Sequence, residues 1–191
     1  ELYWRVAHWY DRDLHKLQEI CDRQPACAKH YPDIRGRLNQ AIEAVVGKPI
    51  EVAVEDVENF PSGKARFFQD IVAFLPFIFL YEQDNYPGIP GLVYAWADAV
   101  ERREEVLFKA IAYASDEAAF GGSSQGMANA IICVDGDAEA QARAGKKDIL
   151  EYPVLGAAIG TAGIWDRRAA LCAELGMDQR PPEQYLPVQT D

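Results

Sequence analysis

The sequence predicts a mainly α-helical domain with at most a short β-hairpin, and three observations carry that prediction. Apolar residues recur at helical spacing along most of the 191 residues, whereas strand-like alternation is confined to one short segment, 50–55. Hydrophobic residues make up 49% of the chain, enough for a sizeable core in a single domain spanning residues 1–191. A free-standing α/β enzyme would need several strands alternating with helices, and the sequence does not supply them.

The first third of the chain predicts two amphipathic helices and then a strand. Residues 2–23 carry one apolar stripe, which predicts a long helix that ends at the break before Pro25. Residues 32–47 begin with Pro-Asp and end at a glycine, as a second helix would. Alternation over 50–55 predicts a half-buried strand, and residues 59–63 form a turn that permits a hairpin.

The remaining elements are predicted to be helical. The aromatic-rich segment 64–81 predicts a buried core helix, kinked at Pro76. The Pro-rich residues 180–191 predict an extended tail. Further helices are expected at 92–103, 104–119, 127–134 (with a buried strand as the alternative), 138–148 and 152–175, the last ending at Gly176 as a C-cap.

The charge balance excludes several classes of partner. The formal net charge is −11, so a nucleic-acid backbone or an anionic membrane would repel the chain. The longest apolar run, 71–81, is about half of what a helix needs to cross a bilayer. Acidic residues gather at 51–58 and 135–139. Such runs are usually solvated surface, although a carboxylate in a recess would suit a substrate ammonium group.

Four cysteines predict two disulfides. Cys21 and Cys27 flank a short turn containing Pro25, and this spacing favours a local bridge, which leaves Cys133 to pair with Cys172. The second bridge would close a loop of about 40 residues and stabilise the fold by roughly 3 to 4 kcal/mol in the chain-entropy description. Four buried free thiols in a cytosolic protein are the alternative, and the absence of a CxxC pair disfavours zinc. We expect a secreted or periplasmic protein.

One motif resembles part of a catalytic site. Residues 122–126, Gly-Ser-Ser-Gln-Gly, match GxSxG with Ser124 at the nucleophile position. The motif needs a buried strand immediately before it, yet residues 114–120 are typical of a helix end. The base histidine should also follow the nucleophile, whereas all three histidines precede it. We expect a Gly/Ser loop there and no catalytic residues in this chain alone.

The first predicted helix carries potential metal ligands along one stripe: His8, Asp11, His15 and Glu19. A di-metal site would need a second helix with a Glu-x-x-His pattern, and the sequence has none. A solvated polar face with i,i+4 pairs is therefore expected, with no metal and no cofactor.

Short motifs along the chain are shared with one family of enzymes: 21–27 (CDRQPAC), 31–33 (YPD), 37–38 (RL), 49–52 (PIEV), 130–135 (AIICVD), Cys172 and 186–191 (LPVQTD). Together they resemble the cap, or lid, domain of secreted α/β-hydrolases of the tripeptidyl-aminopeptidase-like group, related to proline iminopeptidases. The match covers nearly the whole chain and places it between the nucleophile and the acid of the parent enzyme.

The resemblance implies a lid that covers the active site of a secreted serine hydrolase and selects its peptide or ester substrate. Its partner would be the α/β-hydrolase core of the parent protein, which would hold the whole triad, so this chain alone should be inactive. An isolated lid would be able to form a homodimer through its exposed apolar face. The alternative is an autonomous secreted helical binding protein with an apolar groove.

Overall fold

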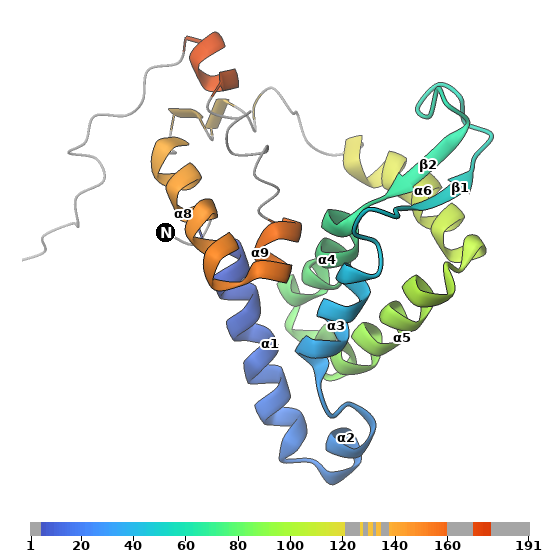
Figure 1. Cartoon of the computed structure of the whole chain (residues 1–191), viewed down its shortest axis with the longest axis vertical. Helices are drawn as coiled ribbons and strands as arrows, with labels where there is room; N and C mark the ends of the chain where they lie inside the picture. Colours follow the sequence, from blue (N-terminus) through green and yellow to red (C-terminus); the bar gives the residue numbers. More distant parts are fainter. Residues whose placement is uncertain are drawn as a thin grey trace, which may run out of the picture.

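The computed structural model describes residues 5–120, 127, 130–131, 133–134, 138–159 and 170–176, and a single β-hairpin interrupts the helices in these ranges (Figure 1). This confirms the mainly α fold with a short hairpin. The helices are α1 (Val6–Asp22), α2 (Pro25–His30), α3 (Ile34–Glu43), α4 (Gln69–Ile78), α5 (Ile89–Arg102), α6 (Glu105–Phe120), α8 (Ala138–Glu151) and α9 (Pro153–Ile159). Two 3-10 segments, η1 (Phe79–Tyr81) and η2 (Gln83–Gly88), join α4 to α5.

The N-terminal helices follow their sequence signals closely. The Asp33 side chain accepts a hydrogen bond from the Gly36 amide at 2.8 Å and so caps the start of α3. The sequence predicts only a break at Pro25, yet α2 begins there. The amide at the first position of a helix has no partner within the helix, so a proline, which has no N–H, costs nothing there. The buried residues of α1 lie at helical spacing: Ala7, Tyr10, Leu14, Leu17 and Cys21.

The hairpin pairs β1 (Ile50–Ala53) with β2 (Lys64–Phe67) in antiparallel register. Ile50 lies opposite Phe67 and both are buried, so the inward side of the hairpin joins the core. The prediction of a helix from residue 64 onward is wrong over the first four residues. Their side chains alternate between exposed and buried, which is the period of a strand and not of a helix.

The core lies between α1, α3, α4, α5 and α9, with the hairpin and α6 on one side and α8 packed beside the start of α1 (Figure 1). Helix α3 packs against both α4 and α5. The largest fully buried side chains of the core include Tyr10, Leu14, Ile34, Leu38 and Phe108.

Helix α4 continues through Pro76 because a tertiary contact satisfies the carbonyl that the proline leaves open. Pro76 has no amide hydrogen, so the Val72 carbonyl loses its helical donor. The indole Nε1–H of Trp96, from α5, donates to that carbonyl at 2.9 Å in a buried position. The lost helical bond is thereby replaced by a bond that fastens α4 to α5.

Asp148 of α8 joins the C-terminal helices to α1. Arg5, the N-cap residue of α1, makes no capping hydrogen bond with its side chain. The buried Asp148 carboxylate instead accepts the amides of Ala7 at 3.0 Å and His8 at 3.4 Å, and it also accepts the Arg5 guanidinium. A carboxylate at a helix N-terminus accepts hydrogen bonds from amides that have no partner within the helix, and its negative charge interacts favourably with the helix dipole.

The C-terminal third agrees with the sequence where it is described. Met127, Ala130, Ile131, Cys133 and Val134 are helical, as predicted for 127–134. The predicted helix 152–175 is seen as α9 and as a helical stretch at 170–174, and residues 160–169 lie outside the described part. The predicted tail at 180–191 also lies outside it. Within the described residues, no helix is long and apolar enough to cross a membrane.

Candidate functional site: an apolar face on α4

Large apolar side chains lie exposed along one face of α4 and the turn that follows it. We call this surface the α4 face and define it by Phe68, Ile71, Phe74, Ile78, Phe79 and Tyr81, whose exposed fractions are 46, 37, 44, 47, 38 and 70%. Steps of three and four residues place most of them on one side of the helix. Isolated apolar residues on a surface are normal, but a contiguous group marks an interaction site.

The opposite side of α4 is buried in the core. Val72, Ala73 and Pro76 point inward and are almost fully covered. The prediction of a buried helix at 64–81 is therefore half wrong, because one side of α4 packs on α9, α3 and α5 while the other faces solvent. An all-apolar helix gives no sequence signal for which side a partner outside the chain would cover.

Aromatic contacts connect the α4 face to the core and fix its geometry. The ring of Phe77 lies 5.0 Å from the buried Tyr10 ring of α1 and 5.5 Å from each of the rings of Phe74 and Tyr81. Such edge and tilted arrangements add to the burial energy of aromatic pairs. Phe74 and Tyr81 are thus exposed but held in place by a half-buried neighbour.

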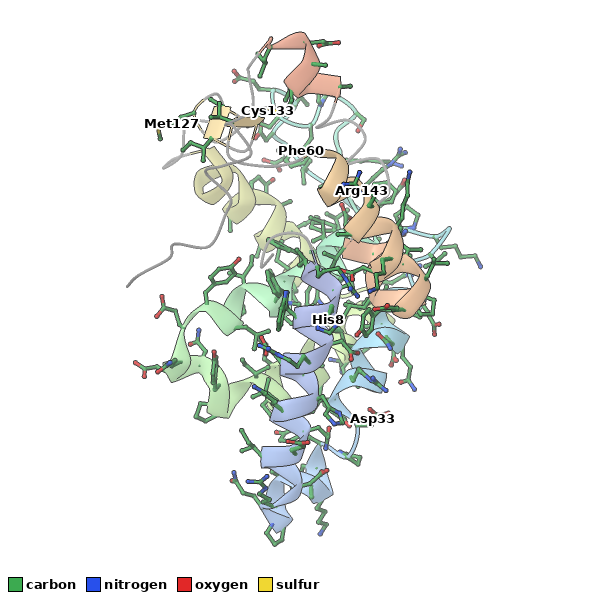
Figure 2. The ribbon with its side chains drawn as sticks, turned by 90° about the vertical axis from the view of Figure 1, so that its left-hand side faces the viewer. His8, Asp33, Phe60, Met127, Cys133 and Arg143 are labelled. Atoms are coloured by element: carbon green, nitrogen blue, oxygen red, sulfur yellow. A yellow bond between two sulfur atoms is a disulfide. The ribbon has the colours of Figure 1, made fainter. Side chains whose placement is uncertain are left out.

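Two side chains of η2 hold the turn after α4. Asn85 donates from Nδ2 to the Phe79 carbonyl at 3.2 Å, and the Tyr86 hydroxyl donates to the Leu80 carbonyl at 3.2 Å. These bonds close η1 against η2, and η2 packs on α5. In Figure 2 the pale green segment that contains α4, η1 and η2 lies at the left of the ribbon.

The chain segment that carries the α4 face has acidic side chains and no basic ones. Residues 67–101 contain no Lys, Arg or His, but they include Asp70 in the first turn of α4 and Glu82 and Asp84 just after η1. Among the described residues, none of these three carboxylates takes part in an ion pair. The candidate site is therefore an apolar surface with unpaired acidic groups at both ends.

The polar stripe of α1 is divided among separate contacts. His8 Nδ1 lies 2.9 Å from the Tyr152 hydroxyl, Asp11 accepts the Arg35 guanidinium at 3.2 Å, and His15 Nε2 lies 3.6 Å from Glu19. Figure 2 shows His8 on the side of α1. In the described part of the chain, no group of side chains is arranged to hold a metal ion.

The acidic segment 51–58 is part of the hairpin surface. Glu51 pairs with Lys64 at 3.3 Å and with Arg66 at 2.8 Å, and the hydrogen bond from Lys64 followed by the charge of Arg66 lowers the pKa of Glu51. Asp56 accepts hydrogen bonds from residues of its own turn. Ser124 and the acidic residues at 135 and 137 lie outside the described part of the chain.

Both predicted disulfides are present and they link the predicted partners. Cys21 is joined to Cys27 and Cys133 to Cys172, so the described chain has no free cysteine. The first bridge ties the end of α1 to α2, and the second closes a sequence separation of 39 residues. Two disulfides are typical of proteins that fold in an oxidising, extracytoplasmic compartment.

Two buried polar side chains, Tyr10 and Asp148, have surroundings that the sequence does not predict. The Tyr10 hydroxyl is fully buried and has no hydrogen-bond partner among the described residues, and burial raises the pKa of this group. Asp148 caps α1 from a distant helix. In the structure Asp148 lies three residues after the buried Gly145, on the inward side of α8, and the sequence alone gives no signal for this. A carboxylate there needs a buried partner, but periodicity does not reveal which one.

Comparisons with protein-family models, with curated proteins and with solved structures found no match to this chain.

Proposed function

We propose that this chain is the cap domain of a secreted serine hydrolase, which covers the active site and selects substrates while the hydrolase core supplies the triad. The observation that carries the proposal is the α4 face. Six large apolar side chains are partly exposed on α4 and the residues that flank it, while the other side of α4 is packed in the core. A cap needs such a surface, because it must lie against another apolar surface and exclude water.

The proposed mechanism of the cap is physical. Packed against the core, the α4 face would close the substrate cleft, which takes a small peptide or ester, and seal it from water. Excluding water strengthens the electrostatic interactions that stabilise a transition state in the core beneath. Movement of the cap would then set access of substrate and release of product.

The motifs that resemble secreted aminopeptidase-like hydrolases support the enzyme class, and the disulfides support the compartment. One bridge lies at the end of α1, and the other joins residues 133 and 172. Secretion or export to the periplasm would provide the oxidising conditions that both bridges require.

The proposal is tested on the full product of the gene. We expect a GxSxG strand-turn-helix encoded upstream of Glu1, and an Asp followed by a His encoded downstream of Asp191. A fluorophosphonate probe should then label the full-length protein at that upstream serine and leave the isolated chain, including Ser124, unlabelled. Stop codons directly flanking the chain, or labelling of the isolated chain that Ser124→Ala abolishes, would rule out the cap.

An autonomous binding protein would use the same apolar face, and the same experiment separates it from a cap. A reading frame without hydrolase motifs, together with a face that captures a separate protein, would favour the binding protein.

A further inference from the structure

The charge pattern around the α4 face restricts what can cover it. This step rests on the proposed function, because it assumes that the face is a docking surface. Many of the carboxylates on other elements are paired: Glu51 with Lys64, Glu101 with Arg37 and Asp148 with Arg5. Asp70, Glu82 and Asp84 have no cation within 67–101 to neutralise them.

A second copy of the chain is a poor occupant for this reason. A twofold contact through the α4 face would bring the same acidic groups toward each other, and like charges across an interface are repulsive. An anionic bilayer is disfavoured for the same reason, since the apolar centre would bring three carboxylates toward negative headgroups.

We propose that the α4 face is covered by a protein surface that is apolar at its centre and carries Lys or Arg side chains opposite Asp70, Glu82 and Asp84. The apolar centre would bind Phe74, Ile78 and Tyr81 by removing them from water. The basic rim would pair with carboxylates that lie at the start of α4 and after η1, and so set the orientation of the partner along the helix. In the proposed enzyme, this surface belongs to the hydrolase core.

The test uses the chain with two model ligands, a short amphipathic helix of leucine and lysine and a matched helix of leucine and glutamate, each with a fluorescent label. Fluorescence anisotropy at low salt should show binding of the lysine peptide at least about tenfold tighter than that of the glutamate peptide. The difference should shrink in high salt.

Matched variants show whether the α4 face, and not the overall charge of −11, provides this preference. Asp70→Asn, Glu82→Gln and Asp84→Asn together should weaken binding of the lysine peptide about tenfold. The control combines Glu55→Gln, Glu58→Gln and Glu174→Gln, which removes the same charge from exposed positions elsewhere. The control should weaken binding by less than about twofold, because its charges lie farther from the ligand.

The apolar centre is tested by Phe74→Ser with Ile78→Ser, which should weaken binding about tenfold. Tyr81→Ser, at a side chain that is 70% exposed, serves as a second variant if the first one unfolds, as judged by circular dichroism.

Equal effects of the two charge sets, or no effect of the apolar variants, would overturn the proposal. So would self-association in sedimentation that Phe74→Ser with Ile78→Ser abolishes, since a second copy would then occupy the face. Binding to phosphatidylglycerol vesicles that Phe74→Ser with Ile78→Ser abolishes would point to a membrane and would also overturn the proposal. These measurements use the isolated chain, so their outcome is independent of whether the gene encodes a hydrolase.

Discussion

At the scale of single residues, a few positions make the specific contacts that hold two elements together. Trp96 satisfies the carbonyl that Pro76 leaves open, and Asp148 caps a helix from which it is distant in sequence. Gly156 permits α9 to pack on the end of α8, where a Cβ atom would lie 2.4 Å from the Asp148 carbonyl oxygen. Each contact joins two elements, so each predicts a measurable loss of stability.

Gly156→Ala should lower the free energy of unfolding by about 1 to 3 kcal/mol, because the new methyl group would overlap backbone atoms that are not free to move. Urea denaturation measures this change. Gly88→Ala is the control, since no atom lies within 4 Å of a Cβ built there and the backbone has ordinary negative φ. A loss of stability at Gly88 equal to that at Gly156 would mean that close packing is not the cause.

Trp96→Phe should cost about 1 to 3 kcal/mol through the unpaired Val72 carbonyl, in addition to lost packing. Pro76→Ala restores an amide that donates to the same carbonyl, so the cost of Trp96→Phe should be smaller in that background. A double-mutant cycle from urea denaturation gives the coupling directly. Additive effects of the two substitutions would contradict the exchange of one hydrogen bond for the other.

At the scale of elements, the helices differ in how their apolar residues are distributed. Helices α1 and α3 have polar outer faces, and their apolar spacing predicts them well. Helix α4 is apolar all round from Ile71 to Ile78, so its spacing predicts a helix but not its exposed side. The helix predicted from residue 64 starts too early and overlaps strand β2, because the alternation of Lys64 to Phe67 is only four residues long and leads directly into the aromatic run of α4.

Helices α3 and α5 are joined at their surface by Arg37, which pairs with Asp98 and Glu101. The hydrogen bond from Arg37 lowers the pKa of Glu101 below its usual value of 4.5. Because the folded-state pKa is below the unfolded one, this pair stabilises the fold at neutral pH. Its contribution is lost as the pH falls below about 4.5 and through the folded-state pKa.

Glu101→Gln should therefore reduce stability at neutral pH, by less than about 1 kcal/mol because the carboxylates are about half exposed, and should make the acid-induced decline shallower. Urea midpoints at neutral pH and at about pH 3 provide the measurement. Glu58→Gln, at an exposed carboxylate of the hairpin turn, should leave the midpoint unchanged at both pH values. If the urea midpoint of the Glu101→Gln variant falls with acid as steeply as that of the parent chain, the ion pair does not contribute in this way.

At the scale of the whole molecule, the disulfides and the α4 face lead to the functional proposal. The cysteine spacing alone predicted both bridges correctly, because a six-residue separation across a turn left a single partner for each remaining cysteine. The α4 face was not predictable in the same way. Its outward residues are chemically the same as its inward ones, and only the fold shows which of them remain in solvent.

Replacing Cys133 and Cys172 together by serine should lower the free energy of unfolding by roughly 3 to 4 kcal/mol, and replacing Cys21 and Cys27 by roughly 2 kcal/mol, because the longer loop gains more chain entropy on unfolding. Urea denaturation of both paired variants checks the order. The reverse order would contradict the entropic explanation and direct attention to strain or packing at each bridge.

The claim that the α4 face is covered in the working protein is tested most directly by hydroxyl-radical footprinting of side chains. The isolated chain is compared with the full-length product of its gene. Phe74, Ile78 and Tyr81 should be labelled strongly in the isolated chain and only weakly in the full-length protein. Tyr113 and Leu150, which are exposed on other elements, should be labelled equally in both. Equal labelling of all five side chains in the two proteins would contradict a cap bound through the α4 face.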